Sequence, residues 1–186
     1  MDKREEKTIK KIHDAFTILI AQKDYDDIVI EDILLIANIS RSTFYAHYKT
    51  KDELLISVSN HIFEHVFSHS LQEEATHDYS KDTFYDYHHL IEHIFYHVQD
   101  EKELFKGILK NNSNEVFLAE FRKHIYHLVN SYYNNYPNSN SSTPLELKKA
   151  IGVEGFITIL KYWINTDFKD SPEDIAKYYF NNVLAI

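Results

Sequence analysis

The sequence predicts an all-α fold of about nine helices, with a small amino-terminal three-helix domain followed by a larger helical domain. Three observations predict it. The 186 residues include only three Gly and three Pro, which a fold rich in tight turns would need in larger numbers. Apolar residues recur at helical spacing along most of the chain, and three capping motifs mark helix starts. We expect the first domain to cover residues 1–50 and the second to cover residues 51–186.

The first three helices follow from apolar spacing and turn residues. One apolar stripe predicts a helix over about residues 4–22, and a second apolar group predicts a short helix over residues 28–37. Asn38 tolerates the left-handed conformation that a tight helix stop requires. Ser40 is a typical capping residue for a third short helix that ends near Tyr48. Residues 28–48 therefore form a helix, a three-residue turn and a second helix.

The later helices are marked mainly by capping boxes. Thr50 and Glu53 have the spacing of such a box and predict a fourth helix that continues to about residue 69. Two similar motifs, at residues 143–146 and 171–174, each include a Pro that suits the first helical position. The remaining predicted helices cover about residues 83–98, 101–110, 114–134, 144–165 and 172–184.

Composition excludes several classes of protein. The chain has no cysteine, which excludes disulfides, thiolate metal sites and cysteine nucleophiles. It has neither a signal-peptide pattern nor an apolar run of membrane-spanning length, so we expect a cytoplasmic protein without membrane contact. The net charge of −9 argues against nucleic-acid binding. However, residues 1–60 carry nine Lys and Arg against eleven Asp and Glu, and no acid lies between Asp32 and Asp52.

The helix after the three-residue turn carries a polar outer face. A helix fits the major groove of DNA, where residues near its amino terminus reach the base edges. The outward residues have donors and acceptors of suitable reach and include no carboxylate: Arg41, Ser42, Thr43, Tyr45 and His47. An ordinary helical hairpin with a polar face gives the same pattern, so spacing alone leaves both interpretations open.

The sequence over about residues 5–60 resembles the TetR/AcrR family of bacterial regulators. The resemblance lies in residues 40–48 (SRSTFYAHY) and 51–55 (KDELL), which follow the second helix. It implies binding to double-stranded operator DNA, with Phe44 and Tyr48 in the core. The residues that the resemblance places against bases or phosphates are Ser40, Arg41, Ser42, Thr43, Tyr45, His47, Lys49 and Lys51.

Three positions depart from the family pattern. The family usually has Gly where this chain has Asp24 and Asn38, and Asn adopts left-handed backbone more readily than Asp does. It usually has Thr as the cap of the second helix, where Val29 stands here. A side-chain cap and a phosphate contact at Val29 are therefore in doubt.

The carboxyl-terminal part resembles a subgroup typified by regulators of dihydroxyacetone kinase. The supporting segments are residues 104–109, 155–163 and 171–176. The resemblance implies the fold and dimerisation of this domain, but it names no ligand. Taken together, the sequence predicts a homodimeric regulator, not an enzyme, that represses transcription and is released from its operator by a small-molecule effector.

Two sets of apolar residues are candidates for a ligand pocket and a dimer contact. Aromatic residues on the predicted helices of the larger domain either line a pocket or fill the core, and the pocket candidates are Phe63, Phe67, Tyr87, Phe95, Phe105, Phe117 and Phe121. The last two helices carry more apolar surface than a two-helix hairpin buries, which favours a symmetric contact with a second copy. Its candidates are Phe156, Ile159, Leu160, Trp163, Ile175, Tyr179 and Val183.

The histidines and acids leave two alternative functions open. Histidines recur four residues apart in two stripes, His61, His65 and His69 and then His89, His93 and His97, and such pairs can share a metal ion. Solvated polar stripes explain the same spacing, so we assign no metal and no cofactor. A di-iron helical-bundle enzyme needs two Glu-x-x-His motifs. The sequence has one, from Glu74 to His77, in a predicted loop.

Overall fold

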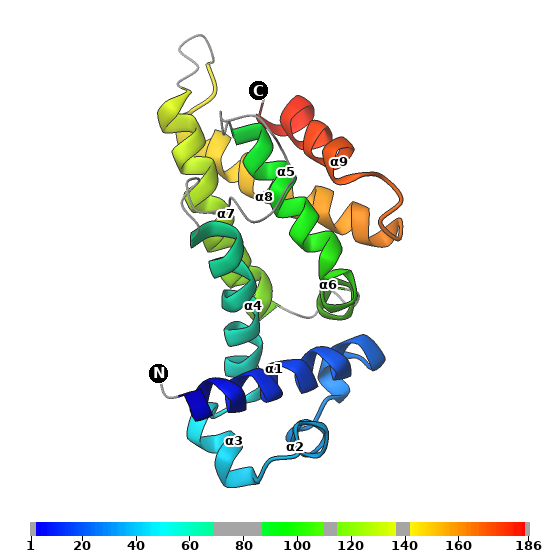
Figure 1. The fold of residues 1–186 in the computed structure, drawn as a ribbon. Helices are drawn as coiled ribbons and strands as arrows, with labels where there is room; N and C mark the ends of the chain where they lie inside the picture. Colours follow the sequence, from blue (N-terminus) through cyan, green and yellow to red (C-terminus); the bar gives the residue numbers. More distant parts are fainter. Residues whose placement is uncertain (1–2, 69–86, 110–114, 137–141, 185–186) are drawn as a thin grey trace. The chain divides into compact units, whose positions relative to one another are not determined.

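The computed structural model describes residues 3–68, 87–109, 115–136 and 142–184, without the side chains of residues 61–68. These residues form nine α-helices and no strand, which confirms the predicted fold class (Figure 1). A 3₁₀ turn, η1 (Tyr25–Asp27), follows α1, and a π-helical turn, η2 (Phe180–Leu184), follows α9. The helices are α1 (Lys3–Gln22), α2 (Ile30–Ala37), α3 (Arg41–His47), α4 (Lys51–Ser68), α5 (Tyr87–Asp100), α6 (Lys102–Leu109), α7 (Glu115–Asn135), α8 (Leu145–Asn165) and α9 (Pro172–Tyr179).

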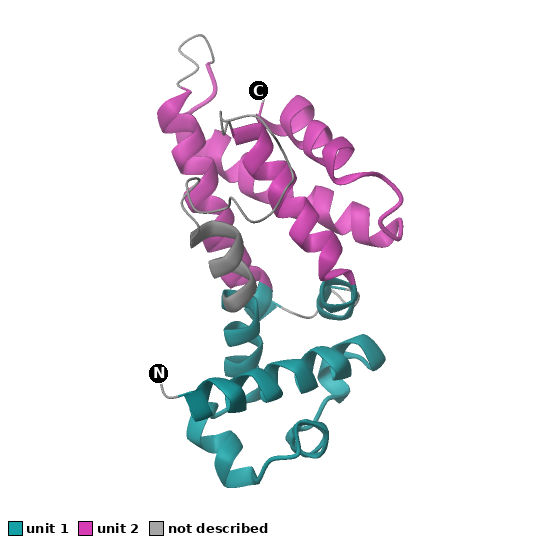
Figure 2. Ribbon diagram, viewed as in Figure 1, with its two compact units in different colours: residues 1–61, 103–117 teal, residues 62–102, 118–186 magenta. Residues whose placement is uncertain are grey.

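The chain forms two compact units (Figure 2). Unit 1 comprises residues 1–61 and 103–117, and unit 2 comprises residues 62–102 and 118–186. Unit 1 includes α6 because this helix packs closely on α1. At Gly107 of α6, an added Cβ would lie only 2.3 Å from the backbone oxygen of Ile20.

The core of unit 1 forms on one face of α1. Its inward side chains recur at helical spacing, and α1 packs against α2. α3 and α4 contribute further apolar side chains that are fully buried. The core includes Ile12, Phe16, Leu19 and Ile20 of α1, Ile33 of α2, Phe44 of α3, and Leu54 and Leu55 of α4.

The core of unit 2 is centred on Phe156 of α8. Its ring is stacked on Phe95 of α5, with centroids 4.8 Å apart, and meets Phe121 of α7 edge-on at 5.8 Å. Tyr179 of α9 packs on the same ring at 5.2 Å, and its hydroxyl donates a hydrogen bond to the backbone oxygen of Gly152 at 3.0 Å. α5, α7 and α9 therefore enclose the inner face of α8.

This packing corrects the residues that were expected to form the dimer contact. Six of its seven candidates are at most 8% exposed and belong to the core of the chain itself: Phe156, Leu160, Trp163, Ile175, Tyr179 and Val183. Only Ile159 is half-buried. α8 and α9 are not an isolated hairpin, because α5 and α7 cover their apolar faces within one copy. Among the described residues, no helix is both long enough and apolar enough to cross a membrane.

Candidate nucleic-acid interface

The turn between α2 and α3 is closed by a left-handed residue, as the sequence predicts. Asn38 has φ 51° and ψ 55°, and its backbone N–H donates to the oxygen of Leu34. The N–H of Ile39 donates to the same oxygen at 3.2 Å. These bonds satisfy the carbonyl at the end of α2 and turn the chain abruptly into Ser40. Asp24, by contrast, has φ −60°, an ordinary value that requires no glycine.

The amino terminus of α3 is capped by side-chain oxygen and is free of acid. Ser40 Oγ accepts a hydrogen bond from the backbone N–H of Thr43 at 3.1 Å. The same oxygen contacts Ser42 Oγ at 2.9 Å and Thr43 Oγ1 at 2.8 Å. Three hydroxyls thus cluster at the positive end of the α3 dipole, where a phosphate would be favoured.

The inward face of α3 is anchored to α1 and α4. Phe44 and Tyr48 are both buried, and the hydroxyl of Tyr48 meets His13 Nε2 at 2.9 Å and Ser57 Oγ at 3.1 Å. Burial raises the pKa of Tyr48. The sequence placed Tyr48 in the core but gave no signal for this polar cluster, because its members lie 9 to 44 residues apart.

Anchoring this face leaves the predicted contact residues of α3 on the opposite face. Arg41, Ser42 and Tyr45 are exposed, whereas Thr43 and His47 are half-buried. The guanidinium of Arg41 forms an ion pair with Glu31 of α2, and both side chains are about 60% exposed (60% and 59%). An exposed pair of this kind contributes little to stability, so Arg41 can leave it to bind another partner.

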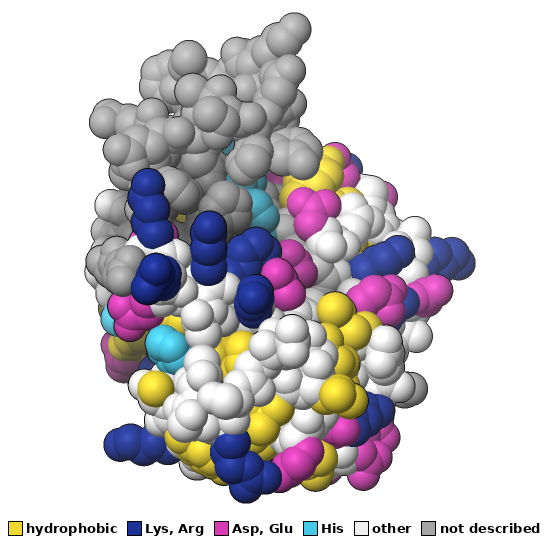
Figure 3. Space-filling view, turned by 60° about the horizontal axis from the view of Figure 1, so that its bottom comes forward, with side chains coloured by type: hydrophobic (Ala, Val, Ile, Leu, Met, Phe, Trp, Pro, Cys, Tyr) yellow, Lys and Arg dark blue, Asp and Glu magenta, His cyan; other side chains and the backbone are white. Residues whose placement is uncertain are grey.

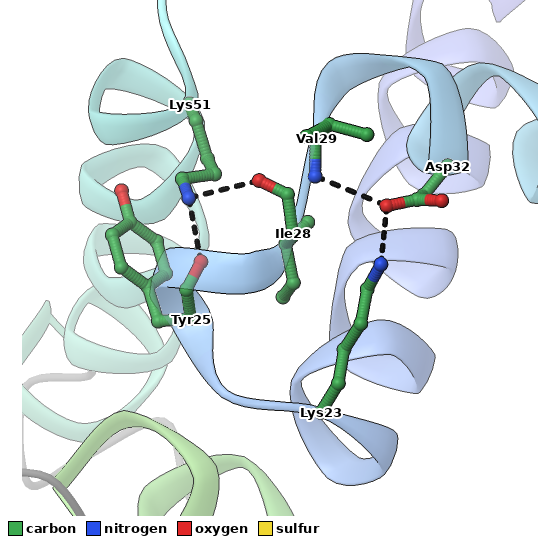
Figure 4. A network of polar contacts seen from close by, with 6 residues as sticks. All are labelled: Lys23, Tyr25, Ile28, Val29, Asp32 and Lys51. Atoms are coloured by element: carbon green, nitrogen blue, oxygen red, sulfur yellow. Dashed lines mark hydrogen bonds and ion pairs between the residues drawn. The ribbon is translucent and has the colours of Figure 1, made fainter.

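The two lysines that follow α3 have different surroundings. Lys49 is exposed, and its backbone N–H donates to Glu53 Oε2 at 2.7 Å. Lys51 is half-buried, and its Nζ donates to the backbone oxygens of Tyr25 at 2.5 Å and Ile28 at 2.9 Å (Figure 4). The structure therefore gives Lys51 partners within the protein that the resemblance did not imply.

The start of α2 is stabilised without a capping side chain at Val29. The carboxylate of Asp32 accepts a hydrogen bond from the backbone N–H of Val29 at 3.0 Å, and Lys23 of the α1 end forms an ion pair with the same carboxylate (Figure 4). The hydrogen bond from Lys23, followed by that from Val29, lowers the pKa of Asp32. Asp32 replaces the missing threonine as the cap, a role that the sequence analysis missed although the Val29 to Asp32 spacing is that of a capping box.

The face that carries α2 and α3 has mixed charge. Figure 3 turns this side of the molecule forward and shows Lys and Arg interspersed with Asp and Glu, with hydrophobic side chains between them. The amino-terminal half of α1 adds five exposed basic residues, Lys3, Arg4, Lys7, Lys10 and Lys11. The exposed acids Glu5 and Glu6 lie among them, so basic side chains outnumber acidic ones on this half of α1 without excluding them.

The predicted pocket residues are core residues where the structure describes them. Four aromatic rings are at most 1% exposed: Phe95 and Phe121 in unit 2, and Phe105 and Phe117 in unit 1. Tyr87 is half-buried, and its hydroxyl bonds Ser131 at 2.5 Å and accepts from Asn135 at 3.0 Å. Phe63 and Phe67 lie outside the described side chains. These four rings therefore pack in the core, because aromatic spacing alone does not separate a core from a pocket.

A different cavity lies between α7 and α8 of unit 2. Its volume is about 460 Å³, and most of its lining is apolar. Three of its charged lining residues form ion pairs: Arg122 pairs with Glu154 at 2.7 Å, and Glu146 pairs with Lys149 at 2.8 Å. Its lining residues are Arg122, Lys123, Tyr126, His127, Glu146, Ala150, Val153 and Glu154.

The histidine stripes form no metal cluster in the described part of the chain. No group of three or more His, Cys, Asp or Glu there could hold a metal ion. His93 and His97 of α5 contact each other through Nε2 atoms 3.0 Å apart, while His89 is exposed. The first stripe, residues 61–69, and the Glu74 to His77 motif lie outside the described side chains.

Two protein families match the chain, one in each half. The family described as "Bacterial regulatory proteins, tetR family" matches residues 12–58, which include α2 and α3. A family described as "Transcriptional regulator C-terminal region", of the TetR type, matches residues 85–184. The second match alone covers more than half of the chain.

The sequence is also similar to those of individual transcriptional regulators. The negative transcriptional regulator IcaR of the Staphylococcus epidermidis biofilm operon is 25% identical over 156 residues, which cover 84% of this chain and 80% of IcaR. An uncharacterized regulator of Bacillus subtilis, YxbF, is 33% identical over 81 residues, but this match spans only 21% of its length and 43% of this chain.

Solved structures share the fold over nearly the whole chain. A TetR transcriptional regulator from Streptococcus agalactiae has a TM-score of 0.77 and 27% identity, and the match covers 98% of this chain and 96% of that one. The dihydroxyacetone kinase operon activator DhaS has the same fold, with a TM-score of 0.67 at 19% identity over 96% and 94% of the two chains. Because family models match both halves of the chain, and one of them covers more than half of it, the chain belongs to the TetR family of bacterial transcriptional regulators.

Proposed function

We propose that this chain is a repressor that places α3 in the major groove of an operator. Regulators of this family bind operator DNA, typically form dimers and are not enzymes. The observation that carries the proposal is the exposed polar face of α3, held outward by Phe44 and Tyr48 and capped by Ser40. The description of IcaR as a negative regulator supports the sign of regulation.

Binding to DNA flanking the chain's own gene tests this proposal. Fluorescence anisotropy compares that DNA with a random duplex of equal length at several salt concentrations. We expect Arg41→Ala to relax sequence preference, because Arg reads guanine through two hydrogen bonds. Equal affinity of the wild-type chain for both duplexes would contradict the proposal. A reporter gene behind the same DNA measures whether binding represses transcription.

We also propose that the chain acts as a homodimer through the outward residues of α8 and α9. The buried candidates are replaced here by side chains that remain exposed, Tyr162 of α8 and Tyr178 of α9, together with the half-buried Ile159. Two copies would place two α3 helices on successive major grooves. Light scattering gives the mass in solution, and Tyr178→Asp combined with Tyr162→Asp is expected to yield monomers.

The effector site that we propose is the cavity between α7 and α8. Its volume lies within the range of about 300–1,000 Å³ that is typical of ligand pockets. A mostly apolar lining surface with charged side chains beside it suits a small molecule with an apolar body and a polar end. Ala150→Phe would fill the cavity. We expect this variant still to bind its operator in the cytoplasm, but we expect the effector no longer to release it from that operator. Retained release would place the effector elsewhere.

A further inference from the structure

Lys51 and Asp52, the first two residues of α4, contact the segment that precedes α2. Lys51 binds the backbone of Tyr25 in this segment, and Asp52 binds the hydroxyl of the same residue. The ammonium of Lys51 donates to the backbone oxygens of Tyr25 and Ile28, and it lies 4.1 Å from the centroid of the Tyr25 ring. Asp52 accepts a hydrogen bond from the hydroxyl of the same tyrosine. We refer to these contacts as the α4 grip; Figure 4 shows the part formed by Lys51.

The α4 grip acts on the residues that lead directly into α2. Ile28 is buried and is followed by Val29, the residue at the start of the helix. From the other side, Lys23 at the end of α1 holds Asp32, which in turn holds the N–H of Val29. The orientation of the first turn of α2 is therefore set by α4 on one side and by α1 on the other.

The surroundings of Lys51 leave it poorly suited to a phosphate contact. An ammonium group has three N–H bonds, and two of them are directed at backbone oxygens while the ring of Tyr25 covers another side. Burial lowers the pKa of Lys51 and is only partly offset by nearby acids, chiefly Asp26 and Asp52. Lys49, two residues earlier, is exposed, so its ammonium group is the better placed of the two lysines for a phosphate contact.

We propose that Lys51 is a positioning residue, which orients α2 and thereby α3 through the η1 segment instead of contacting DNA. The inference rests on the proposed function, since it assigns a role in operator binding. The contacts of Lys51 with Tyr25 and Ile28 would also make the start of α4 and the start of α2 move together. A displacement of the first turn of α4 would then be passed to α2 through the Tyr25 and Ile28 carbonyls.

The salt dependence of operator binding separates the two roles of Lys51. Each phosphate contact contributes about 0.9 to the slope of log affinity against log salt concentration. For Lys51→Met we expect affinity for operator to fall about tenfold while the slope stays unchanged, because a charge-assisted contact is lost but no phosphate contact is. Lys49→Met is the matched control for loss of one exposed charge, and its slope is expected to fall by about 0.9.

A fall in slope for Lys51→Met would overturn the proposal, as would unchanged operator affinity of the folded variant. Tyr25→Phe keeps the charge of Lys51 and removes only the Asp52 bond, so it provides a second test if Lys51→Met does not fold. We expect about a threefold loss of affinity at unchanged slope, and no loss would also count against the proposal.

Hydrogen exchange tests the α4 grip without DNA, which separates its failure from that of the proposed function. In Lys51→Met, exchange of the amides of residues 26–32 is expected to be about tenfold faster, with α7 unchanged. Unchanged exchange would show that the contacts do not order the segment, whatever the chain binds.

Discussion

The guanidinium of Arg41 in α3 forms an ion pair with the carboxylate of Glu31 in α2, across the turn that joins the two helices. The pair joins the two helices on their exposed sides, because both side chains remain largely exposed. A base or phosphate that binds Arg41 must compete with Glu31. In the proposed complex, Glu31 would therefore oppose DNA binding both by pairing with Arg41 and by its own negative charge.

Glu31→Gln is therefore expected to bind DNA more tightly. Exposed ion pairs contribute up to about 1 kcal/mol, so we expect an increase of up to about fivefold in affinity, for operator and random DNA alike. Fluorescence anisotropy measures both affinities. Glu120→Gln makes the same charge change in an ion pair with Lys123 of α7 and should leave affinity unchanged. Weaker binding by Glu31→Gln would show that Glu31 orients Arg41 usefully.

Ser40→Ala is expected to destabilise the chain by about 1 kcal/mol, the usual cost of removing a helix cap. The loss is expected to weaken operator binding as well, because α3 begins at this cap. Urea unfolding gives the first quantity and anisotropy the second.

The matched control for the cap is Ser171→Ala. Ser171 Oγ accepts from the N–H of Asp174 at 3.2 Å at the start of α9, so its loss should cost a similar amount of stability. Because α9 belongs to unit 2, operator affinity should not change. If both variants weaken binding equally, the effect of Ser40→Ala is one of general stability.

Asp32 should make stability depend on acidity. Its pKa is lowered in the folded chain, so its contribution is complete above the unfolded value of about 3.9 and is lost as the pH falls through the folded value. In Asp32→Asn, this loss below about pH 4 should be absent, and stability at neutral pH should be lower because the ion pair with Lys23 is gone.

Urea unfolding of the wild type and of Asp32→Asn, from neutral pH to below about pH 4, measures how the stability of each depends on pH. Asp14→Asn, which removes an exposed pair with Lys10 in α1, is the control and should change neutral stability less. Parallel acid curves for Asp32→Asn and the wild type would show that Asp32 contributes nothing to acid sensitivity.

Gly107→Ala is expected to destabilise unit 1 by about 1–3 kcal/mol, as overpacking does. The new Cβ would meet both a side-chain carbon and the backbone oxygen of Ile20 at 2.3 Å, so α6 must move away from α1. In Gly152→Ala the nearest atoms belong to the side chains of Val129 and Leu184, so a smaller loss is expected. Thermal unfolding compares the two variants, and a higher melting temperature for Gly107→Ala would mean that helix propensity outweighs the clash.

Features that depend on near neighbours could be predicted from the sequence. The caps at Ser40, Thr50 and Ser171 and the left-handed turn at Asn38 each involve residues within a few positions of one another. One local prediction fails by a residue: α8 begins at Leu145, with Pro144 before the helix and no side-chain cap. The existence of α3 and the exposure of Arg41, Ser42 and Tyr45 on it belong to this local class.

Features that depend on distant partners could not be predicted. Lys51 was expected to contact phosphate, yet its partners Tyr25 and Ile28 lie 26 and 23 residues away. The apolar residues of α8 were expected to meet a second copy, yet Phe95 of α5 and Phe121 of α7 cover Phe156. Spacing shows that a face is apolar, but it does not show which neighbour covers that face.

The sequence by itself determined the all-helical class, the helix starts, the turn at Asn38 and the exposed face of α3, because short-range hydrogen bonds and apolar spacing encode them. Only the tertiary structure decided which side chains of α8 and α9 are buried within one copy, and that Lys51 turns inward to the η1 segment. These outcomes depend on how whole helices pack, since contacts between residues far apart in the chain arise from the combined fit of many side chains.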